Sequence, residues 1–257
     1  MHTAKLFELH GKTAIITGGA TGIGKQMAEA LADMGANVVI AARNLARCQK
    51  AAAELEKTGI KALAFSCDVV DPKQVQEMVD KTMDEFGQID ILVNNSGTSW
   101  GGRPEDLALE DWRKVMEVNV TGTFLCTQAV GRVMISQKSG RIINVASIEG
   151  LQGCSGEIVE AIVYNTSKGA VINFTRDLAC KWAKHSITVN AIAPGWFPTD
   201  MTERLFELRK DELLRTIPME RFGTGHELKG AVVFLASPAS SYVTGQVLVV
   251  DGGATSW

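Results

Sequence analysis

The sequence has few of the residues from which metal sites and disulfide frameworks are built. It contains five cysteines and four histidines among 257 residues. The cysteines form no CxxC pair and the histidines are dispersed, at positions 2, 10, 185 and 226. Because this spacing fits neither a zinc site nor a disulfide framework, we expect no metal and reduced thiols, as in a cytoplasmic protein.

Two further absences exclude whole classes of partner. No apolar run approaches the roughly 20 residues of a membrane-spanning helix. Lys5, Glu8 and Lys12 near the start of the chain argue against a secretory leader. The net charge of −3 lacks the excess of lysine and arginine that a large nucleic-acid surface needs. We therefore expect neither membrane nor nucleic acid as a partner.

The pattern of what is present predicts one α/β domain. Apolar runs predict strands at 13–17, 37–42, 61–66, 89–94, 141–146, 188–193 and 246–250. Amphipathic stretches predict helices near 22–34, 44–58, 72–86, 105–137 (in two pieces divided near Leu109), 160–184 and 225–236. The runs at 38–40 and 247–250 lack polar alternation, which is typical of strands covered on both faces. We predict a doubly wound, parallel, seven-stranded Rossmann-type sheet with helices on both faces, in a single domain spanning 1–257.

One interval interrupts the alternation of strands and helices. No strand is predicted between Pro194 and Gly225, but 201–214 has helical spacing and is rich in Arg, Glu and Leu. An insertion after the sixth strand lies near the carboxyl ends of the strands, where open α/β sheets bind ligands. We expect the segment near 196–216 to cover a substrate pocket; the alternative is a surface excursion.

A glycine-rich turn, Thr17-Gly-Gly-Ala-Thr-Gly-Ile-Gly24, follows the first predicted strand and opens a helix. Glycines at 18, 22 and 24 allow a tight turn and a close backbone approach, and the helix N-terminus presents amides to a pyrophosphate. A purely structural turn is the rival interpretation. Its position at the first crossover favours dinucleotide binding.

Tyr164 and Lys168 lie four residues apart on a predicted helix, so both side chains project from one face. An ammonium about 4 Å from a phenol, at an effective dielectric near 20, favours the phenolate by about 4 kcal/mol. That would lower the tyrosine pKa by roughly 3 units, toward neutrality, where it exchanges protons during turnover. The alternative is a surface tyrosine beside a solvated lysine, and Ser147 at a strand end favours the catalytic interpretation.

The ordered motifs resemble the short-chain dehydrogenase/reductase family in its compact single-domain branch, over roughly Leu9 to Gly253. The glycine turn has the family's TGxxxGxG spacing, Asn94-Asn-Ser-Gly97 resembles its NNAG, and Pro194-Gly-Trp-Phe-Pro-Thr199 resembles its PGxxxT segment. The family's catalytic tetrad matches, in order, Asn119, Ser147, Tyr164 and Lys168.

The resemblance implies a role for each of these residues. Tyr164 acts as acid in ketone reduction and as base in alcohol oxidation, Lys168 tunes it and binds the nicotinamide ribose, and Ser147 donates to the substrate oxygen. Asn119 helps to hold a water-linked proton path from Lys168 toward solvent, and a structural role as a helix-kinking polar residue is compatible with it. Predicted cofactor contacts are Gly18, Thr21, Gly22, Ile23, Gly24, Arg43, Asp68, Val69, Asn95, Gly97, Tyr164, Lys168, Pro194, Gly195 and Thr199.

The end of the second strand predicts the cofactor. An NAD-selecting fold places an acid about 20 residues beyond the glycine turn. Here Ala42 removes that carboxylate and Arg43 offers a planar donor to a 2′-phosphate, which predicts NADP. NAD is the rival if Arg43 stacks on adenine instead. Asp68 resembles the family's adenine-contacting acid, with a helix N-cap ahead of Pro72 as the alternative.

The substrate pocket is less specified. The resemblance places its walls at Ser99, Trp100, Glu149 and Trp196, with Ile148, Phe197, Met201 and Leu205 beside them, although such residues also serve as core. Sixteen residues separate Ser147 from Tyr164, more than in most members of this branch. The extra material within 151–160 would bring Glu157 or Glu160 near the substrate or form a harmless loop.

These observations predict an NADP-preferring oxidoreductase that transfers a hydride between the nicotinamide and a carbonyl or secondary alcohol. Candidate substrates are a 3-oxoacyl thioester, a gluconate-like sugar acid, and a cyclic or aliphatic alcohol. The alternative is a non-catalytic nucleotide-binding regulatory protein on the same fold. Enoyl reductases are disfavoured because they place tyrosine and lysine farther apart. The resemblance also implies a homotetramer or homodimer.

Overall fold

The computed structural model describes residues 2–156, 159–200 and 202–257. Within them one sheet runs in the spatial order β3-β2-β1-β4-β5-β6-β7, and every neighbouring pair is parallel. This order confirms the predicted doubly wound, seven-stranded parallel sheet. The strands are β1 (Thr13–Thr17), β2 (Asn37–Ala42), β3 (Ala62–Ser66), β4 (Ile91–Asn94), β5 (Gly140–Val145), β6 (Ile187–Pro194) and β7 (Val247–Val250).

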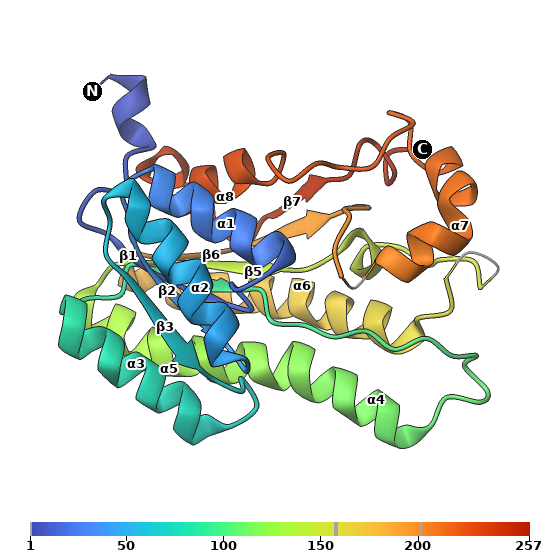
Figure 1. Cartoon of the computed structure of the whole chain (residues 1–257), viewed down its shortest axis with the longest axis horizontal. Helices are drawn as coiled ribbons and strands as arrows, with labels where there is room; N and C mark the ends of the chain where they lie inside the picture. Colours follow the sequence, from blue (N-terminus) through green and yellow to red (C-terminus); the bar gives the residue numbers. More distant parts are fainter. Residues whose placement is uncertain (1, 157–158, 201) are drawn as a thin grey trace.

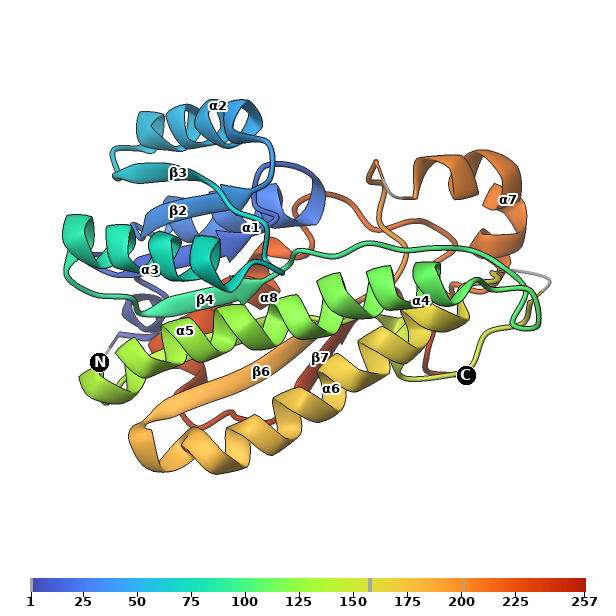
Figure 2. The same cartoon turned by 90° about the horizontal axis from the view of Figure 1, so that it is seen from below.

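Helices cover both faces of the sheet (Figure 1). They are α1 (Gly22–Asp33), α2 (Leu45–Leu55), α3 (Pro72–Phe86), α4 (Leu109–Met116), α5 (Gly122–Gln137), α6 (Ile162–Trp182), α7 (Glu203–Arg215) and α8 (Lys229–Ala236). Helices α1, α2 and α8 pack on one face, and α3, α5 and α6 on the other. Figure 2 shows α4 and α5 as one long rod that runs beside α6. None of the described helices is both long enough and apolar enough to span a membrane.

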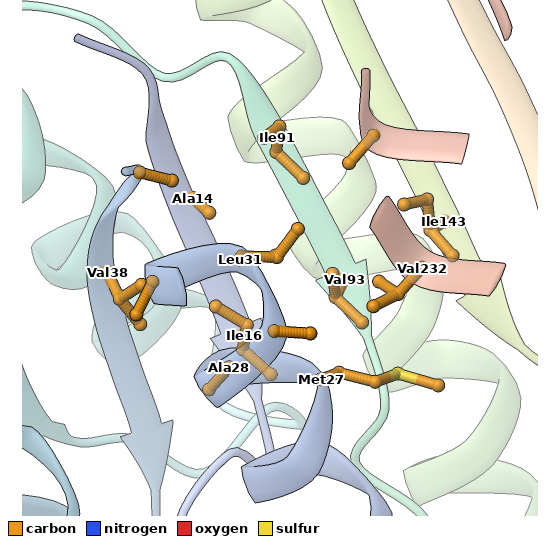
Figure 3. Close-up of a cluster of buried hydrophobic side chains, with 14 of the residues drawn as sticks. Ala14, Ile16, Met27, Ala28, Leu31, Val38, Ile91, Val93, Ile143 and Val232 are labelled. Carbon is orange, nitrogen blue, oxygen red and sulfur yellow. The ribbon is translucent and has the colours of Figure 1, made fainter. Parts of the chain in front are cut away.

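The two faces of each central strand are both apolar because each has its own layer of helices. Ala14 and Ile16 of β1 belong to the cluster formed with α1 and α8, whereas Ile15 belongs to the cluster on the opposite face. In Figure 3, Met27 and Leu31 of α1 lie over this sheet face. Burying such a side chain stabilises the fold by about 1.5–3 kcal/mol. This double burial explains the strands' continuous apolar sequence.

Several predicted helices have different bounds in the structure; the helix predicted at 225–236, for example, begins at Lys229. Residues 105–108 are not helical, so the helix predicted at 105–137 begins at Leu109 instead of being divided there. Its real irregularity is a π-helical turn at Glu117–Thr121, between α4 and α5. The helix predicted at 201–214 is α7, which has a kink at Arg209. Met201 and Glu157 lie outside the described residues.

Candidate active site

A groove of about 600 Å³ crosses the carboxyl ends of the strands. It is lined by residues at or just beyond the ends of β1 to β6, because parallel strands bring these ends to one edge of the sheet. Every residue predicted to contact the cofactor lies in its wall: Gly18, Thr21, Gly22, Ile23, Gly24, Arg43, Asp68, Val69, Asn95, Gly97, Tyr164, Lys168, Pro194, Gly195 and Thr199. Their binding roles stay predictions.

The glycine turn is pressed against the end of β4. A Cβ at Gly24 would lie 2.3 Å from Asn95 Nδ2 and 2.4 Å from the Gly18 carbonyl oxygen, so only glycine fits. Asn95 Nδ2 in turn donates to the carbonyl oxygens of Thr17 and Gly18, at 3.1 Å each. Asn95, which is distant in the sequence and lies just beyond the end of β4, thus holds the glycine turn in place.

The start of α1 fits a pyrophosphate. Its N-cap residue, Thr21, makes no side-chain capping hydrogen bond, and its first turn contains no acidic residue. Gly22 and Ile23 of this first turn line the groove. Helix N-termini carry unpaired amides and the positive end of the helix dipole, which together attract anions. These residues therefore fit the diphosphate of a dinucleotide.

Two arginines lie at the end of the groove beyond β2. Arg43 directly follows the strand, and Arg47 is in the first turn of α2; both are exposed and line the groove beside Ala42. Arg47 was missed by the sequence analysis, which considered only the strand end. Asp68 also lines the groove, and it does not cap α3. The N-cap is Asp71, whose carboxylate accepts the amides of Lys73 and Gln74.

Ser147, Tyr164 and Lys168 meet in the wall of the groove. Ser147 lies two residues beyond the end of β5, and Tyr164 and Lys168 lie one turn apart on α6. The Ser147 side chain hydrogen-bonds the Tyr164 phenol. Lys168 Nζ lies 5.5 Å from the centre of the Tyr164 ring and donates to the Val145 carbonyl oxygen at 2.8 Å. The arrangement gives two hydroxyl groups and a buried ammonium at one point.

The pKa of Tyr164 is raised in the structure, whereas we predicted that it would be lowered. Burial of the phenol raises its pKa to about 12, although the hydrogen bond from Ser147 acts in the other direction. Burial likewise lowers the pKa of Lys168 to about 8. Desolvation penalises the charged form of each group. The Lys168 ammonium donates its hydrogen bond to a carbonyl rather than to the phenol, so desolvation prevails over the predicted attraction.

Asn119 lies in the π-helical turn and is buried, and its Oδ1 would be 3.5 Å from a Cβ at Gly97 of the groove wall. Its Oδ1 accepts the Thr98 amide at 2.8 Å, while its Nδ2 donates to the Thr98 carbonyl at 2.9 Å and to Ser167 Oγ at 2.8 Å. The extra residue of a π turn is frequent at functional sites. Asn119 thus joins the strand β4 loop to α6, next to Lys168.

None of the four predicted substrate residues is among the described residues that form the wall of the groove. Ser99 is partly buried, and Trp100 is 44% exposed with Lys114 Nζ 5.5 Å from its ring centre. Glu149 is buried, and Trp196 packs edge-on against Phe206. Ile148 and Phe197 are buried, and Leu205 is partly buried. Their contact with substrate stays a prediction.

The loop with extra residues is tied to the loop after β4. Gly102 bridges Ala161 in parallel, and its amide donates to the Glu160 carbonyl oxygen at 2.9 Å. Glu160 is exposed, and its carboxylate lies 3.9 Å from Arg103 Nε. The Glu160 carboxylate therefore forms an ion pair with Arg103 at the surface. Glu157 lies outside the described residues.

Comparisons with known proteins agree with this arrangement. Residues 18–255 match a family model described as enoyl-(acyl carrier protein) reductase. The chain is 42% identical over 250 residues to a 3-oxoacyl-[acyl-carrier-protein] reductase from Synechocystis sp., covering 95% of this chain and 97% of that protein. It is 41% identical over 252 residues to a gluconate 5-dehydrogenase from Gluconobacter oxydans, covering 97% of each. A crystal structure of a gluconate 5-dehydrogenase from Burkholderia cenocepacia in complex with NADP and tartrate has a TM-score of 0.95 at 37% identity, covering 100% of both chains.

Proposed function

The chain belongs to the short-chain dehydrogenase/reductase family and is an NAD(P)-dependent oxidoreductase acting on CH–OH groups, and we propose that it prefers NADP and works through Ser147, Tyr164 and Lys168. The observation that carries the proposal is the position of these three side chains in the wall of the groove that begins at the glycine turn. Candidate substrates are a 3-oxoacyl thioester, a gluconate-like sugar acid, and a cyclic or aliphatic alcohol.

The chain's own groups supply binding and proton transfer. When bound, the nicotinamide supplies the hydride chemistry. Tyr164 gives its phenolic proton to the carbonyl oxygen in reduction and takes a proton back in oxidation. Ser147 donates a hydrogen bond to the same oxygen and stabilises the charge that develops there. Because the pKa of Tyr164 is about 12, the phenol carries its proton at neutral pH, as a donor to a carbonyl requires.

The catalytic role is tested with Tyr164→Phe, which removes the hydroxyl and keeps the ring. General acid–base catalysis contributes about 100- to 10,000-fold, so we expect kcat/KM to fall by at least about 100-fold. NADP binding, followed by tryptophan fluorescence, should persist. Undiminished turnover by Tyr164→Phe would favour the second candidate function, a non-catalytic nucleotide-binding regulator.

Two arginines support the preference for NADP. Arg43 and Arg47 both line the groove beyond β2, where Ala42 leaves no carboxylate. Charge-assisted hydrogen bonds contribute about 1.5–3 kcal/mol, so Arg43→Ala should lower kcat/KM for NADP by about tenfold or more and change that for NAD little. Lys50→Ala, which removes a positive charge from the neighbouring helix α2 outside the groove wall, is the matched control. NADP efficiency spared by Arg43→Ala would contradict the assignment.

The spacing of four residues between Tyr164 and Lys168 on α6 supports carbonyl reduction over enoyl reduction. We also propose that the segment near 196–216, which contains α7, covers the substrate, since Thr199, Asp200 and Thr202 line the groove. Assembly into a homodimer or homotetramer is supported by Phe124 of α5, which is 44% exposed. Light scattering that gives a concentration-independent monomer would contradict assembly.

A further inference from the structure

A buried serine lies on α6 between the two proposed catalytic residues of that helix. Ser167 comes three residues after Tyr164 and directly before Lys168, and it is fully buried. Its Oγ donates to the Tyr164 carbonyl oxygen at 2.7 Å and accepts a hydrogen bond from Asn119 Nδ2 at 2.8 Å. Because a hydroxyl group has one proton, the donation to Tyr164 leaves Oγ as an acceptor toward Asn119. The hydroxyl thus joins α6 to the π-helical turn.

The Asn119 amide continues this connection to the loop after β4. Its two Nδ2 protons have two acceptors, which are Ser167 Oγ and the Thr98 carbonyl oxygen at 2.9 Å. Its Oδ1 accepts the Thr98 amide at 2.8 Å. Asn119 is 1% exposed, and a buried N–H that loses its acceptor is costly. Removing Ser167 Oγ would therefore leave one Nδ2 proton unpaired and release the amide from α6.

The loop that Asn119 holds forms the groove wall beside Lys168. Gly97 and Thr98 both line the groove. A Cβ at Gly97 would lie 3.5 Å from Asn119 Oδ1 and 3.7 Å from Lys168 Nζ. A displacement of the Asn119 amide would therefore move this wall relative to the Lys168 ammonium. In an active site, a misplacement of about 1 Å costs about 100-fold in rate, so a small displacement has a measurable effect.

We propose that Ser167 is a positioning residue, which acts through Asn119 to hold the groove wall at Thr98 in a fixed position relative to Lys168. The proposal rests on the proposed function, because it takes this part of the groove as the place where an alcohol or ketone reacts. A serine that only stabilised its own helix would need no partner outside α6. Ser167 has such a partner, and the partner's remaining hydrogen bonds all lead to the groove wall.

Kinetics of Ser167→Ala, alone and combined with Asn119→Ala, test the link in the full-length chain with NADP and the best alcohol. We expect Ser167→Ala to lower kcat/KM by about tenfold, because a buried donor loses its acceptor. Asn119→Ala breaks the same link, so the double variant should match Asn119→Ala in kcat/KM within about twofold, whereas independent losses would multiply. Thr166→Ala is the matched control, because it removes an exposed hydroxyl that donates to the Ile162 carbonyl oxygen of α6 at 2.8 Å. Its kcat/KM should stay within about twofold of the wild type.

A second readout is independent of turnover. Because the Thr98 amide donates to Asn119 Oδ1, its hydrogen exchange reports on the link. Ser167→Ala should speed exchange around Thr98 by about tenfold and leave exchange along α6 near that of the wild type.

Three results would overturn the proposal. The first is faster exchange along α6 with unchanged exchange around Thr98, which would assign Ser167 a role within its own helix only. The second is wild-type kcat/KM in Ser167→Ala. The third is a double variant that loses a further factor of about ten relative to Asn119→Ala. If no alcohol or ketone is turned over with either nicotinamide, the proposed function itself fails, and amide exchange still tests the link.

Discussion

The turn after Ser147 approaches α6 so closely at Gly150 that there is no room for a methyl group. A Cβ at Gly150 would lie 2.6 Å from the Lys168 carbonyl carbon, 2.7 Å from the Gly169 nitrogen and 2.8 Å from the Lys168 oxygen. Favourable contacts between carbon atoms are about 3.5–4.0 Å, so Gly150→Ala must move the turn and the helix apart by about 1 Å. All three atoms belong to the backbone and cannot rotate away. The shift separates Ser147 from Tyr164 and Lys168.

The expected effect on catalysis is larger than the effect on stability. A misplacement of about 1 Å costs about 100-fold in rate, so kcat/KM of Gly150→Ala should fall by about that factor. Overpacking costs about 1–3 kcal/mol, and each 1 kcal/mol lowers the unfolding midpoint by about 2–4 °C in a chain of this size. Steady-state kinetics with the best alcohol or ketone and a thermal melt of the same sample measure both.

Gly153→Ala is the matched control. It lies in the same loop, and a Cβ at Gly153 would meet no atom within 4 Å. We expect its kcat/KM and its melting midpoint to stay near those of the wild type. The reasoning is refuted if Gly150→Ala retains wild-type kcat/KM, or if Gly153→Ala loses as much activity.

Three further variants test the site and the core. Burial lowers the pKa of Lys168 from the ordinary lysine value of 10.5 to about 8 in the folded chain. Between pH 8 and 10.5 the unfolded chain therefore binds more protons than the folded chain. Because of this, the free energy of unfolding rises with pH in that range. In urea titrations, the unfolding free energy of the wild type should rise by about 2–3 kcal/mol relative to Lys168→Met between pH 8 and 10.5, and a constant difference would contradict this pKa. Phe206 of α7 stacks on Phe222 with ring centres 4.0 Å apart, and such pairs contribute about 0.5–1.5 kcal/mol. Phe206→Ala should therefore loosen the segment 196–216 and raise KM for the substrate, whereas Leu208→Ala, 69% exposed on the same helix, should not. Leu31 of α1 is fully buried, so Leu31→Ala should lower the unfolding free energy by about 2–5 kcal/mol in urea titrations; a loss below about 0.5 kcal/mol would contradict its place in the core.

The strands and the groove were predictable because they follow from local pattern and topology. Apolar runs bounded by turn residues define β1 and β2 with the predicted bounds. Parallel strands then bring their carboxyl ends together, so strand-end residues such as Gly18 and Asn95 could be assigned to one groove. Arg47 was missed because it lies on α2 rather than on the strand. Its spacing of four from Arg43 would have been the available signal.

The π-helical turn at Glu117–Thr121 and the neighbours of Glu149 could not be predicted from local pattern. Asn119 is held by Thr98 and Ser167, which are distant in the sequence, and Glu149 is held by Asn165. Each contact depends on how a loop after one strand packs against α6. Helical spacing carries no information about such partners, and this is why the predicted substrate residues remained the least specified.

The pKa of Tyr164 shows which interaction the sequence argument lacked. Spacing on a helix correctly brings Lys168 to the same face as the phenol, but it does not fix the direction of the ammonium protons. Val145 accepts one of them at 2.8 Å, and the low dielectric of the buried site penalises both the phenolate and the ammonium. In this structure the hydrogen bond from Ser147 is the interaction that lowers the phenol's pKa. In the proposed mechanism, Ser147 would therefore have two roles in turn, because its single hydroxyl proton can be donated either to the Tyr164 phenol, which lowers the phenol's pKa, or to the substrate oxygen.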